Sequence, residues 1–254
     1  MKSSIYKALI LDVDGTTIKN QSDAMPSEKV KSAIRKADKI VKVGLATSRP
    51  FWHVIHIIEI LQINAPCILA GGSQIYDPKL KRIVWEKTIE KNDIEQIFKI
   101  SKSLGIEIKD DATGKHVRDE KININDYAKK GPLQFWVPDL KPDLSQTLID
   151  KLSSISTIAA LKVPSWKNGF SDVIISHAQG TKQHGILEVA KLLNIKTHEI
   201  IGVGDGDNDF PLLMACGLKI AMGNATEGLK QIADFVAPNV EDDGVAKIIE
   251  KFIL

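Results

Sequence analysis

Four short apolar runs, each ending in acidic, hydroxyl or glycine residues, constrain the fold of this chain most strongly. They read ALILDVD (8–14), VKVGLATS (41–48), CILAGG (67–72) and EIIGVGDGD (199–207). Their length and lack of polar alternation are typical of strands buried on both faces of a sheet. Helical patterns lie between or after them, at 26–39, 51–61 and 185–194. This alternation predicts an α/β fold with a doubly wound parallel sheet.

The middle of the chain has a different pattern. Between residues 82 and 177, strand-like pieces mix with two helical segments, and Pro and Gly recur densely. We interpret this stretch as a second, α+β domain inserted into the first. The predicted core domain is then discontinuous, with residues 1–81 and 178–254 on either side of an inserted domain at 82–177.

Charge and cysteine content exclude several classes of partner. The formal net charge of +2 on 254 residues predicts neither a nucleic-acid partner nor a membrane surface. The longest apolar stretch, FWHVIHIIEILQI, is interrupted by His and Glu and is too short to span a bilayer. Cys67 and Cys216 are far apart in apolar surroundings, which suits a reducing compartment. We therefore expect a cytoplasmic protein. No sequence feature distinguishes a monomer from a homodimer.

The polar residues that follow the predicted strands mark a candidate site. Ligands of open α/β sheets bind outside the carboxyl ends of the strands. A single Asp at such a place usually caps a turn, but here several strands deliver polar groups to one edge. The groups are Asp12, Asp14, Thr47, Ser48, Arg49, Gly71 to Ser73, Asp205, Asp207, Asn208 and Asp209.

A cluster of carboxylates of this kind requires cations. Two like charges ~4 Å apart repel by about 4 kcal/mol at an effective dielectric constant of about 20. A divalent ion with oxygen ligands resolves this, and Mg²⁺ suits a site that combines carboxylates with a substrate phosphate. Gly15, Gly204 and Gly206 would let backbone N–H groups approach a ligand closely. Lys182, at the start of a predicted helix, is a candidate for further positive charge, although a solvated surface lysine is as good an interpretation from its position alone.

Together these residues resemble the four motifs of the haloacid dehalogenase superfamily. The motifs are DVDGT (12–16), LATSRP (45–50), Lys182 and GDGDND (204–209). The following PLLMACGLKIAMGNATEGLKQIADFV and EDDGVAKII resemble the Cof-like subfamily with a type IIB cap. The resemblance covers the core and implies that the inserted domain is a cap that excludes water and reads the leaving group.

The resemblance implies a role for each motif position. Asp12 would be the nucleophile and Asp14 the general acid and base, while Thr47 and Lys182 would complete the catalytic set. Asp12, Asp14, Asp205 and Asp209 would hold Mg²⁺, Asp14 through its carbonyl, and Asp209 with Asn208 would orient metal waters or Lys182. The residues implied to bind substrate are Gly15, Thr16, Ser48, Arg49 and Asn208.

Other positions carry weaker expectations. An aspartate at position 14, which the dehalogenases of the superfamily lack, indicates phosphate-ester chemistry. Many relatives read NGA where this chain has Gly71-Gly72-Ser73, and KG where it has Lys182-Gln183. Trp136 is interpreted as cap core, and His53 and His56 as helix-surface residues rather than metal ligands. The candidate substrate contacts of the cap are Lys115, His116, Arg118, Trp166, Lys167 and Asn168.

The function that follows is a Mg²⁺-dependent phosphatase that acts through an aspartyl-phosphate. Its expected substrate is a small phosphorylated metabolite, such as a sugar phosphate or a phosphoglycolate-like acid. A phosphomutase or phosphotransferase of the same fold is the alternative within the enzyme class. A non-catalytic binding module is a third interpretation, which is disfavoured because every motif position is filled.

Overall fold

The computed structural model describes residues 5–21, 23–110, 131–165 and 167–254. The chain divides into two compact units. Unit 1 comprises Met1–Trp85 and Lys182–Leu254, and unit 2 comprises Glu86–Thr181. Unit 2 is thus an insertion in the sequence of unit 1.

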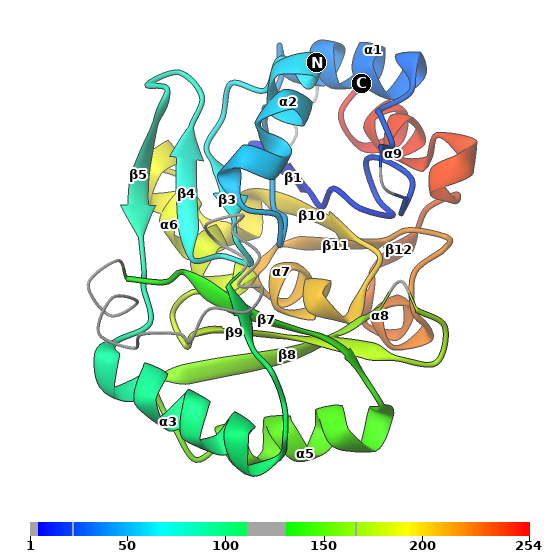
Figure 1. The fold of residues 1–254 in the computed structure, drawn as a ribbon. Coiled ribbons are helices and arrows are strands. Elements are labelled where there is room, and N and C mark those ends of the chain that lie inside the picture. The colour runs from blue at the N-terminus through cyan, green and yellow to red at the C-terminus, as the bar shows by residue number, and fades with distance from the viewer. Residues whose placement is uncertain (1–4, 22, 111–130, 166) are drawn as a thin grey trace. The chain divides into compact units, whose positions relative to one another are not determined.

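A five-stranded parallel sheet forms the centre of unit 1 (Figure 1). Its strand order is β12-β11-β10-β1-β2, and every neighbouring pair is parallel. The strands are β1 (Ala8–Leu11), β2 (Lys42–Leu45), β10 (Ile200–Gly204), β11 (Leu218–Ala221) and β12 (Phe235–Val236). The sequence pattern does not predict β11 and β12 as strands, because Lys219 interrupts the apolar residues of β11 and β12 has only two residues.

Both faces of this sheet are buried, as expected for strands without polar alternation. Successive side chains of β1 enter different apolar clusters, with Leu9 and Leu11 in one and Ala8 and Ile10 in the other. Helices α1 (Glu28–Ala37), α2 (Phe51–Leu61) and α9 (Gly244–Phe252) contribute to the first cluster. Helices α6 (Lys182–Leu193), α7 (Phe210–Ala215) and α8 (Glu227–Ile232) contribute to the second. The predicted doubly wound α/β core is confirmed.

The run at 67–72 does not simply extend the parallel sheet. It supplies β3 (Cys67–Leu69), which pairs antiparallel with β4 (Gln74–Asp77) in a three-stranded sheet completed by β5 (Arg82–Glu86). The chain reverses directly after Leu69, through Ala70, Gly71 and Gly72, which all have positive φ. One isolated parallel bridge, Ala46 to Ile68, still connects β3 to the end of β2.

The division between the units differs slightly from the predicted one. The sequence pattern predicts that the inserted domain begins at residue 82, but β5 belongs to the small sheet of unit 1, so that unit runs to Trp85. On return, unit 2 ends at Thr181 rather than at residue 177. Strand β9 is followed by a turn in which Gly180 N–H donates to the His177 carbonyl, and α6 starts only at Lys182.

Unit 2 has α+β architecture. Its antiparallel sheet has the order β6-β7-β9-β8, formed by β6 (Lys109–Asp110), β7 (Gln134–Leu140), β8 (Ile158–Pro164) and β9 (Ser171–His177). Helices α3 (Lys91–Ser103) and α5 (Pro142–Leu152) cover one face of this sheet (Figure 1). Phe135 and Val173 of the sheet pack there against Ile94 and Leu148 of the helices.

Trp136 does not belong to this cluster, contrary to its interpretation as cap core. Strand alternation places it on the opposite face from Phe135, in register with Ile174 and, through β9, with Leu161. It is half-buried, and its indole N–H donates to Asp172 Oδ2 at 2.9 Å. Of the expected cap contacts, Lys167 and Asn168 are exposed, whereas Lys115, His116, Arg118 and Trp166 lie outside the described residues.

Three short 3-10 turns, η1 (Thr197–Glu199), η2 (Asp207–Asp209) and η3 (Val240–Asp242), connect elements of unit 1. Cys67 and Cys216 are both buried free thiols, and burial raises the pKa of each. Within the described part of the chain, no helix is both long enough and apolar enough to cross a bilayer.

Candidate active site

The carboxyl edge of the parallel sheet gathers the acidic groups that the sequence predicts there. Asp12 follows β1, Thr47 follows β2 and Asp205 follows β10, and these three strands are neighbours. Parallel strands end at a common edge, so residues almost 200 positions apart in sequence meet. Lys182 comes to the same place because it begins α6.

Lys182 connects two of the carboxylates. Its Nζ lies 2.6 Å from Asp12 Oδ1 and 2.5 Å from Asp209 Oδ1, and the residue is 1 % exposed. Burial alone would lower the pKa of Lys182, but the two carboxylates outweigh it and raise that pKa above its usual value. The two carboxylates therefore favour the charged ammonium form of Lys182, and the interpretation as a solvated surface lysine is wrong.

The acidic cluster fits a divalent cation. Asp12, Asp205 and Asp209 each offer a carboxylate oxygen, and these oxygens lie within 4.8 Å of one another. Burial, followed by the neighbouring Asp209 carboxylate, raises the pKa of Asp12 well above its ordinary value and that of Asp205 to about 7. Three carboxylates face one ammonium group, so their ionised forms need further positive charge. An all-oxygen set of this kind suits Mg²⁺.

The carboxylate of Asp209 accepts hydrogen bonds from three groups of the site. Its Oδ1 accepts from Lys182, and its Oδ2 accepts from the backbone N–H groups of Asp205 and Gly206 at 3.0 and 3.1 Å. Both oxygens therefore already have partners. Asp209 fixes the loop after β10 and the position of Lys182, whereas each oxygen of Asp205 accepts one hydrogen bond and Asp12 Oδ2 accepts none from the described residues.

The carboxylate of Asp14 points to a different partner. Arg49 Nε donates to Asp14 Oδ2 at 2.8 Å, and Nη2 donates to Oδ1 at 2.5 Å. Asp14 is outside the group of carboxylates that lie within 4.8 Å of one another. The Asp14 side chain is 32 % exposed, so it remains accessible beside the buried Asp12.

The remaining predicted site residues surround these groups. Thr16 Oγ1 donates to Asp205 Oδ1 at 3.0 Å, so its hydroxyl orients an acid. Thr47 is buried, and its Oγ1 accepts from the Arg49 N–H at 3.0 Å. Asn208 Nδ2 donates to Ser48 Oγ at 3.4 Å, which brings the loops after β10 and β2 together. Asp207 instead accepts from the Thr226 hydroxyl at 2.7 Å and belongs to the outside of this loop.

Gly15 allows the first motif to approach Asp205. Its φ is +76°, and a Cβ there would lie 2.1 Å from Asp205 Oδ2. A side chain at this position would thus displace a carboxylate of the cluster. The small residue type at position 15 is required by both backbone conformation and space.

Sequence reasoning missed two residues that hold the site together. Asn224 Nδ2 donates to the Gly15 carbonyl at 2.8 Å and to Asp205 Oδ2 at 3.3 Å. Thr17 Oγ1 donates to the Asp12 carbonyl at 2.6 Å. Asn224 follows β11, so recognition of that short strand would have placed it at the carboxyl edge with the other polar groups.

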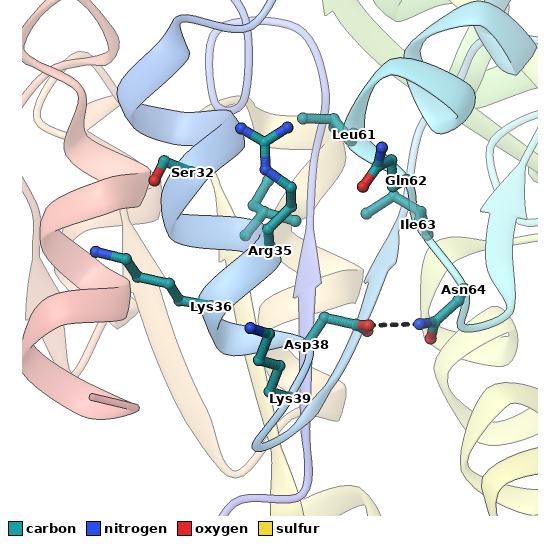
Figure 2. A pocket seen from close by; sticks show the side chains of 10 residues that line it. Ser32, Arg35, Lys36, Asp38, Lys39, Leu61, Gln62, Ile63 and Asn64 are labelled. Atoms are coloured by element: carbon teal, nitrogen blue, oxygen red, sulfur yellow. Dashed lines mark hydrogen bonds between the residues drawn. The ribbon is translucent and has the colours of Figure 1, made fainter.

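A cavity of about 500 Å³ lies elsewhere on unit 1, near the C-terminal ends of α1 and α2 (Figure 2). Its lining includes Ser32, Arg35, Asp38, Gln62 and Asn64 and none of the motif residues. Helices of a doubly wound sheet run antiparallel to the strands, so their C-terminal ends lie away from the carboxyl edge. The cavity is separate from the acidic cluster.

Three histidines that the structure describes lie outside the acidic cluster. His53 and His56 both lie on α2, and His53 is exposed and stacks on Trp52 at 5.0 Å between ring centroids. His177 is buried at the end of β9, where its Nδ1 accepts from the Gln179 N–H at 2.9 Å. None of the three belongs to the candidate metal-binding group found among the described residues.

Comparison with known proteins agrees with the fold and with the family that the sequence resembles. A model of haloacid dehalogenase-like hydrolases matches residues 9–249. A 5-amino-6-(5-phospho-D-ribitylamino)uracil phosphatase of Bacillus subtilis, YcsE, is 26% identical over 251 residues, covering 98% of this chain and 96% of that protein. A phosphoglycolate phosphatase of Sulfolobus acidocaldarius is 24% identical and covers 98% of this chain and 97% of its own length.

Solved structures show the same fold over nearly the whole chain. The phosphatase BT1666 from Bacteroides thetaiotaomicron has a TM-score of 0.82 at 24% identity, covering 99% of this chain and 97% of that one. The subclass IIB sugar phosphatase BT4131 has a TM-score of 0.78 at 22% identity, with 97% and 98% covered. With the family model spanning almost all of both segments of unit 1 and the whole of unit 2, the chain belongs to the haloacid dehalogenase-like hydrolase family.

Proposed function

We propose that this protein is a Mg²⁺-dependent phosphoric monoester hydrolase that releases phosphate from a small phosphorylated metabolite through an aspartyl-phosphate on Asp12. The observation that carries this proposal is the arrangement around Asp12. One carboxylate oxygen is paired with the buried Lys182, and the carboxylates of Asp205 and Asp209 lie beside it. The phosphatase names of the full-length relatives support the same reaction class.

Asp12 is suited to nucleophilic attack. Its Oδ1 accepts from Lys182, and no hydrogen bond to Oδ2 is formed by any residue that the structure describes. In the first step Asp12 Oδ2 forms a bond to phosphorus as the bond from phosphorus to the ester oxygen breaks. Lys182 offsets the repulsion between the carboxylate and the phosphate, so the nucleophile can approach a dianion.

Asp14 handles the protons. In its protonated form, with the pair to Arg49 open, it gives a proton to the departing alcohol oxygen in the first step. The resulting carboxylate takes a proton from the attacking water in the second step. The second step forms a bond from water oxygen to phosphorus, breaks the bond from phosphorus to Asp12, and releases inorganic phosphate. Arg49 fixes the orientation of the Asp14 carboxylate through two hydrogen bonds. Its guanidinium also brings positive charge to the edge where phosphate would bind.

Asp12 and Asp205 would hold Mg²⁺, with Asp209 keeping the loop in place. The ion would supply positive charge to the phosphoryl oxygens and balance the cluster of carboxylates. Thr16 orients Asp205 through its hydroxyl, and the pairs Thr47–Arg49 and Ser48–Asn208 set the positions of the surrounding loops. Most of the rate enhancement in such a site comes from positioning and electrostatics.

Our proposal for the substrate class is based on the names of the relatives and not on the geometry of the acidic cluster. The names of full-length relatives include phosphatases of a ribitylaminouracil phosphate and of phosphoglycolate, which are both small phosphorylated metabolites. We propose a substrate of that size, a sugar phosphate or a phosphorylated small acid. Unit 2 is proposed to act as the cap that reads the leaving group.

The experiment that tests the proposal is the substitution Asp12→Asn, assayed with p-nitrophenyl phosphate and a panel of phosphorylated metabolites. We expect turnover to fall by about 1,000-fold or more, because an amide cannot attack phosphorus. Asp150→Asn on α5, exposed and hydrogen-bonded to Gln146, is the matched control and should retain full activity. Activity that survived in Asp12→Asn with unchanged Mg²⁺ dependence would refute the nucleophile assignment.

The fate of phosphate separates hydrolysis from transfer. A hydrolase releases one inorganic phosphate for each ester consumed, which a molybdate assay measures directly. Transfer to a second sugar hydroxyl without phosphate release would instead establish a phosphotransferase or mutase. Binding of Mg²⁺ with no turnover across the panel would indicate a binding module.

A further inference from the structure

Asn224 lies in the loop between β11 and α8 and touches three separate parts of unit 1. Its Nδ2 donates to the Gly15 carbonyl at 2.8 Å and to Asp205 Oδ2 at 3.3 Å. Its Oδ1 accepts from the Val240 N–H at 2.9 Å, at the start of η3. Both N–H groups and the oxygen of one carboxamide are therefore used, and two of the three bonds go to the acidic site.

The Asp205 carboxylate is held from both sides. Thr16 Oγ1 donates to Oδ1 and Asn224 Nδ2 donates to Oδ2, which fixes the plane of the carboxylate. Without these two donors the side chain could rotate about its terminal bond, because that torsion is broad. A metal ligand that is already held in one orientation binds the ion more tightly than a freely rotating one, because it loses less conformational entropy on binding.

The chemistry of an amide suits this place. Asn224 donates hydrogen bonds to an anion without adding a charge, so the net charge available for a cation is unchanged. It also connects Asp205 to the Gly15 carbonyl, in the loop that follows Asp12 and Asp14. The distance between the two halves of the acidic site is thus set partly by one side chain.

We propose that Asn224 is a positioning residue that orients the Asp205 carboxylate for Mg²⁺ and locks it to the loop carrying Asp12 and Asp14. This inference rests on the proposed function. Asn224 acts through its neighbours and is itself exposed. An exposed side chain contributes little to the free energy of unfolding, so its removal should change metal affinity far more than stability.

The test is the affinity of the purified full-length protein for Mg²⁺, measured by titration calorimetry without any substrate. Asn224→Ala should raise the dissociation constant for Mg²⁺ by roughly 10-fold, in the range that loss of a partner of a metal ligand produces. Asn239→Ala is the matched control and should leave the affinity unchanged, because this exposed side chain of the same region bonds, among the described residues, only to Asp242. Thermal denaturation of both variants reports folding.

Asn224→Asp is the second variant. It retains an oxygen for the Val240 N–H but places a carboxylate against Asp205 Oδ2 and the Gly15 carbonyl. We expect its turnover at saturating Mg²⁺ to fall by about 10-fold or more with little change in melting temperature. Because the hydrogen bond from the Val240 N–H is preserved, a lower turnover in this variant would result from a change in the acidic site and not from a change in η3.

The outcomes separate this inference from the proposed function. Unchanged Mg²⁺ affinity in a folded Asn224→Ala, or unchanged turnover in Asn224→Asp should the alanine variant not fold, overturns the positioning role. A wild type that binds no divalent cation overturns it as well. A wild type that binds Mg²⁺ but hydrolyses nothing refutes the phosphatase proposal, whereas weakened Mg²⁺ binding in Asn224→Ala would still support the role of Asn224.

Discussion

Arg49 holds Asp14 by a two-point ion pair, with Nε to Oδ2 at 2.8 Å and Nη2 to Oδ1 at 2.5 Å. The pair fixes the carboxylate in one orientation, because the planar guanidinium matches both of its oxygens. The backbone N–H of Arg49 is in turn bonded to the buried Thr47 Oγ1. The proton-handling group of the proposed reaction is thus anchored through the second motif.

We first predict that Arg49→Lys lowers kcat by roughly 10- to 100-fold, since lysine retains the charge but loses the two-point pairing. The loss should be larger with a sugar phosphate than with p-nitrophenyl phosphate, whose leaving group needs little help from an acid. Steady-state kinetics with both substrates measure this difference. Arg35→Lys on α1, an exposed arginine in the last turn of that helix, is the control. Equal losses with both substrates would mean that Arg49 serves phosphate binding instead.

The second prediction concerns the pH dependence of stability in metal-free protein. Burial and the Asp209 carboxylate raise the pKa of Asp205 from an ordinary 3.8 to about 7. Between these values the unfolded chain releases a proton that the folded chain retains, so the free energy of unfolding should fall as pH rises from about 4 to about 7. The raised pKa of Asp12 acts in the same direction.

Chemical denaturation in EDTA across this pH range measures how the free energy of unfolding changes with pH. Excess Mg²⁺ should restore stability most strongly at the upper end, because it binds the ionised cluster. Asp205→Asn removes the titrating group and should flatten the slope. A metal-free protein whose stability rises over the same interval would contradict this account of the cluster.

The third prediction concerns the close approach of the first motif to Asp205. Gly15→Ala places a methyl group 2.1 Å from Asp205 Oδ2, at a φ of +76°. We expect activity to be lost by about 100-fold or more, because the carboxylate must move away from the cluster. Measurement of kcat and of the Mg²⁺ activation constant tests this.

Gly105→Ala separates backbone strain from the clash. Gly105 has a similar φ of +66°, and a Cβ there would meet nothing within 4 Å. This variant should be destabilised by about 1 kcal/mol through strain alone and should retain its Mg²⁺ activation constant. If both glycine variants lost activity equally, crowding of Asp205 would not be the cause.

Much of the site could be predicted because parallel topology brings strand ends together. Once the runs before Asp12, Thr47 and Asp205 are recognised as neighbouring buried strands, their polar successors must share an edge. Lys182 could be included only through its motif, since its sequence position also suits a surface lysine. Its burial between Asp12 and Asp209 depends on how α6 packs.

Other features depend on geometry that no local pattern reveals. The pairing of Arg49 with Asp14 is decided by the rotamers of a long side chain, and a guanidinium could equally have faced a substrate phosphate. The run at Cys67–Leu69 has the composition of a central strand, but the reversal through Gly71 and Gly72 pairs it with β4 instead. Asn224 escapes the sequence pattern because Lys219 interrupts the apolar run of β11 that precedes it.

The last prediction concerns Asp38 and Asn64, which lie on the wall of the cavity away from the site (Figure 2). Asn64 Nδ2 donates to Asp38 Oδ2, while Asp38 Oδ1 and Asn64 Oδ1 are buried and have no partner in the described structure. Asn64→Asp replaces the donor with a second carboxylate of nearly equal shape. At neutral pH the two charges would repel, so we expect the free energy of unfolding to fall by about 1–3 kcal/mol.

Acid should reverse this effect, because a proton shared by the two carboxyl groups restores the hydrogen bond. Urea denaturation at pH 7 and at pH 4.5 would therefore show that the free energy of unfolding of Asn64→Asp is lower than that of the wild type, and that this difference becomes smaller as the pH falls. Asn64→Ala, which removes the donor without adding charge, should give a deficit that changes little with pH. Catalytic activity should remain that of the wild type in both variants, because the pair lies apart from the acidic cluster. A deficit in Asn64→Asp that stayed constant between the two pH values would mean that the carboxylates do not meet.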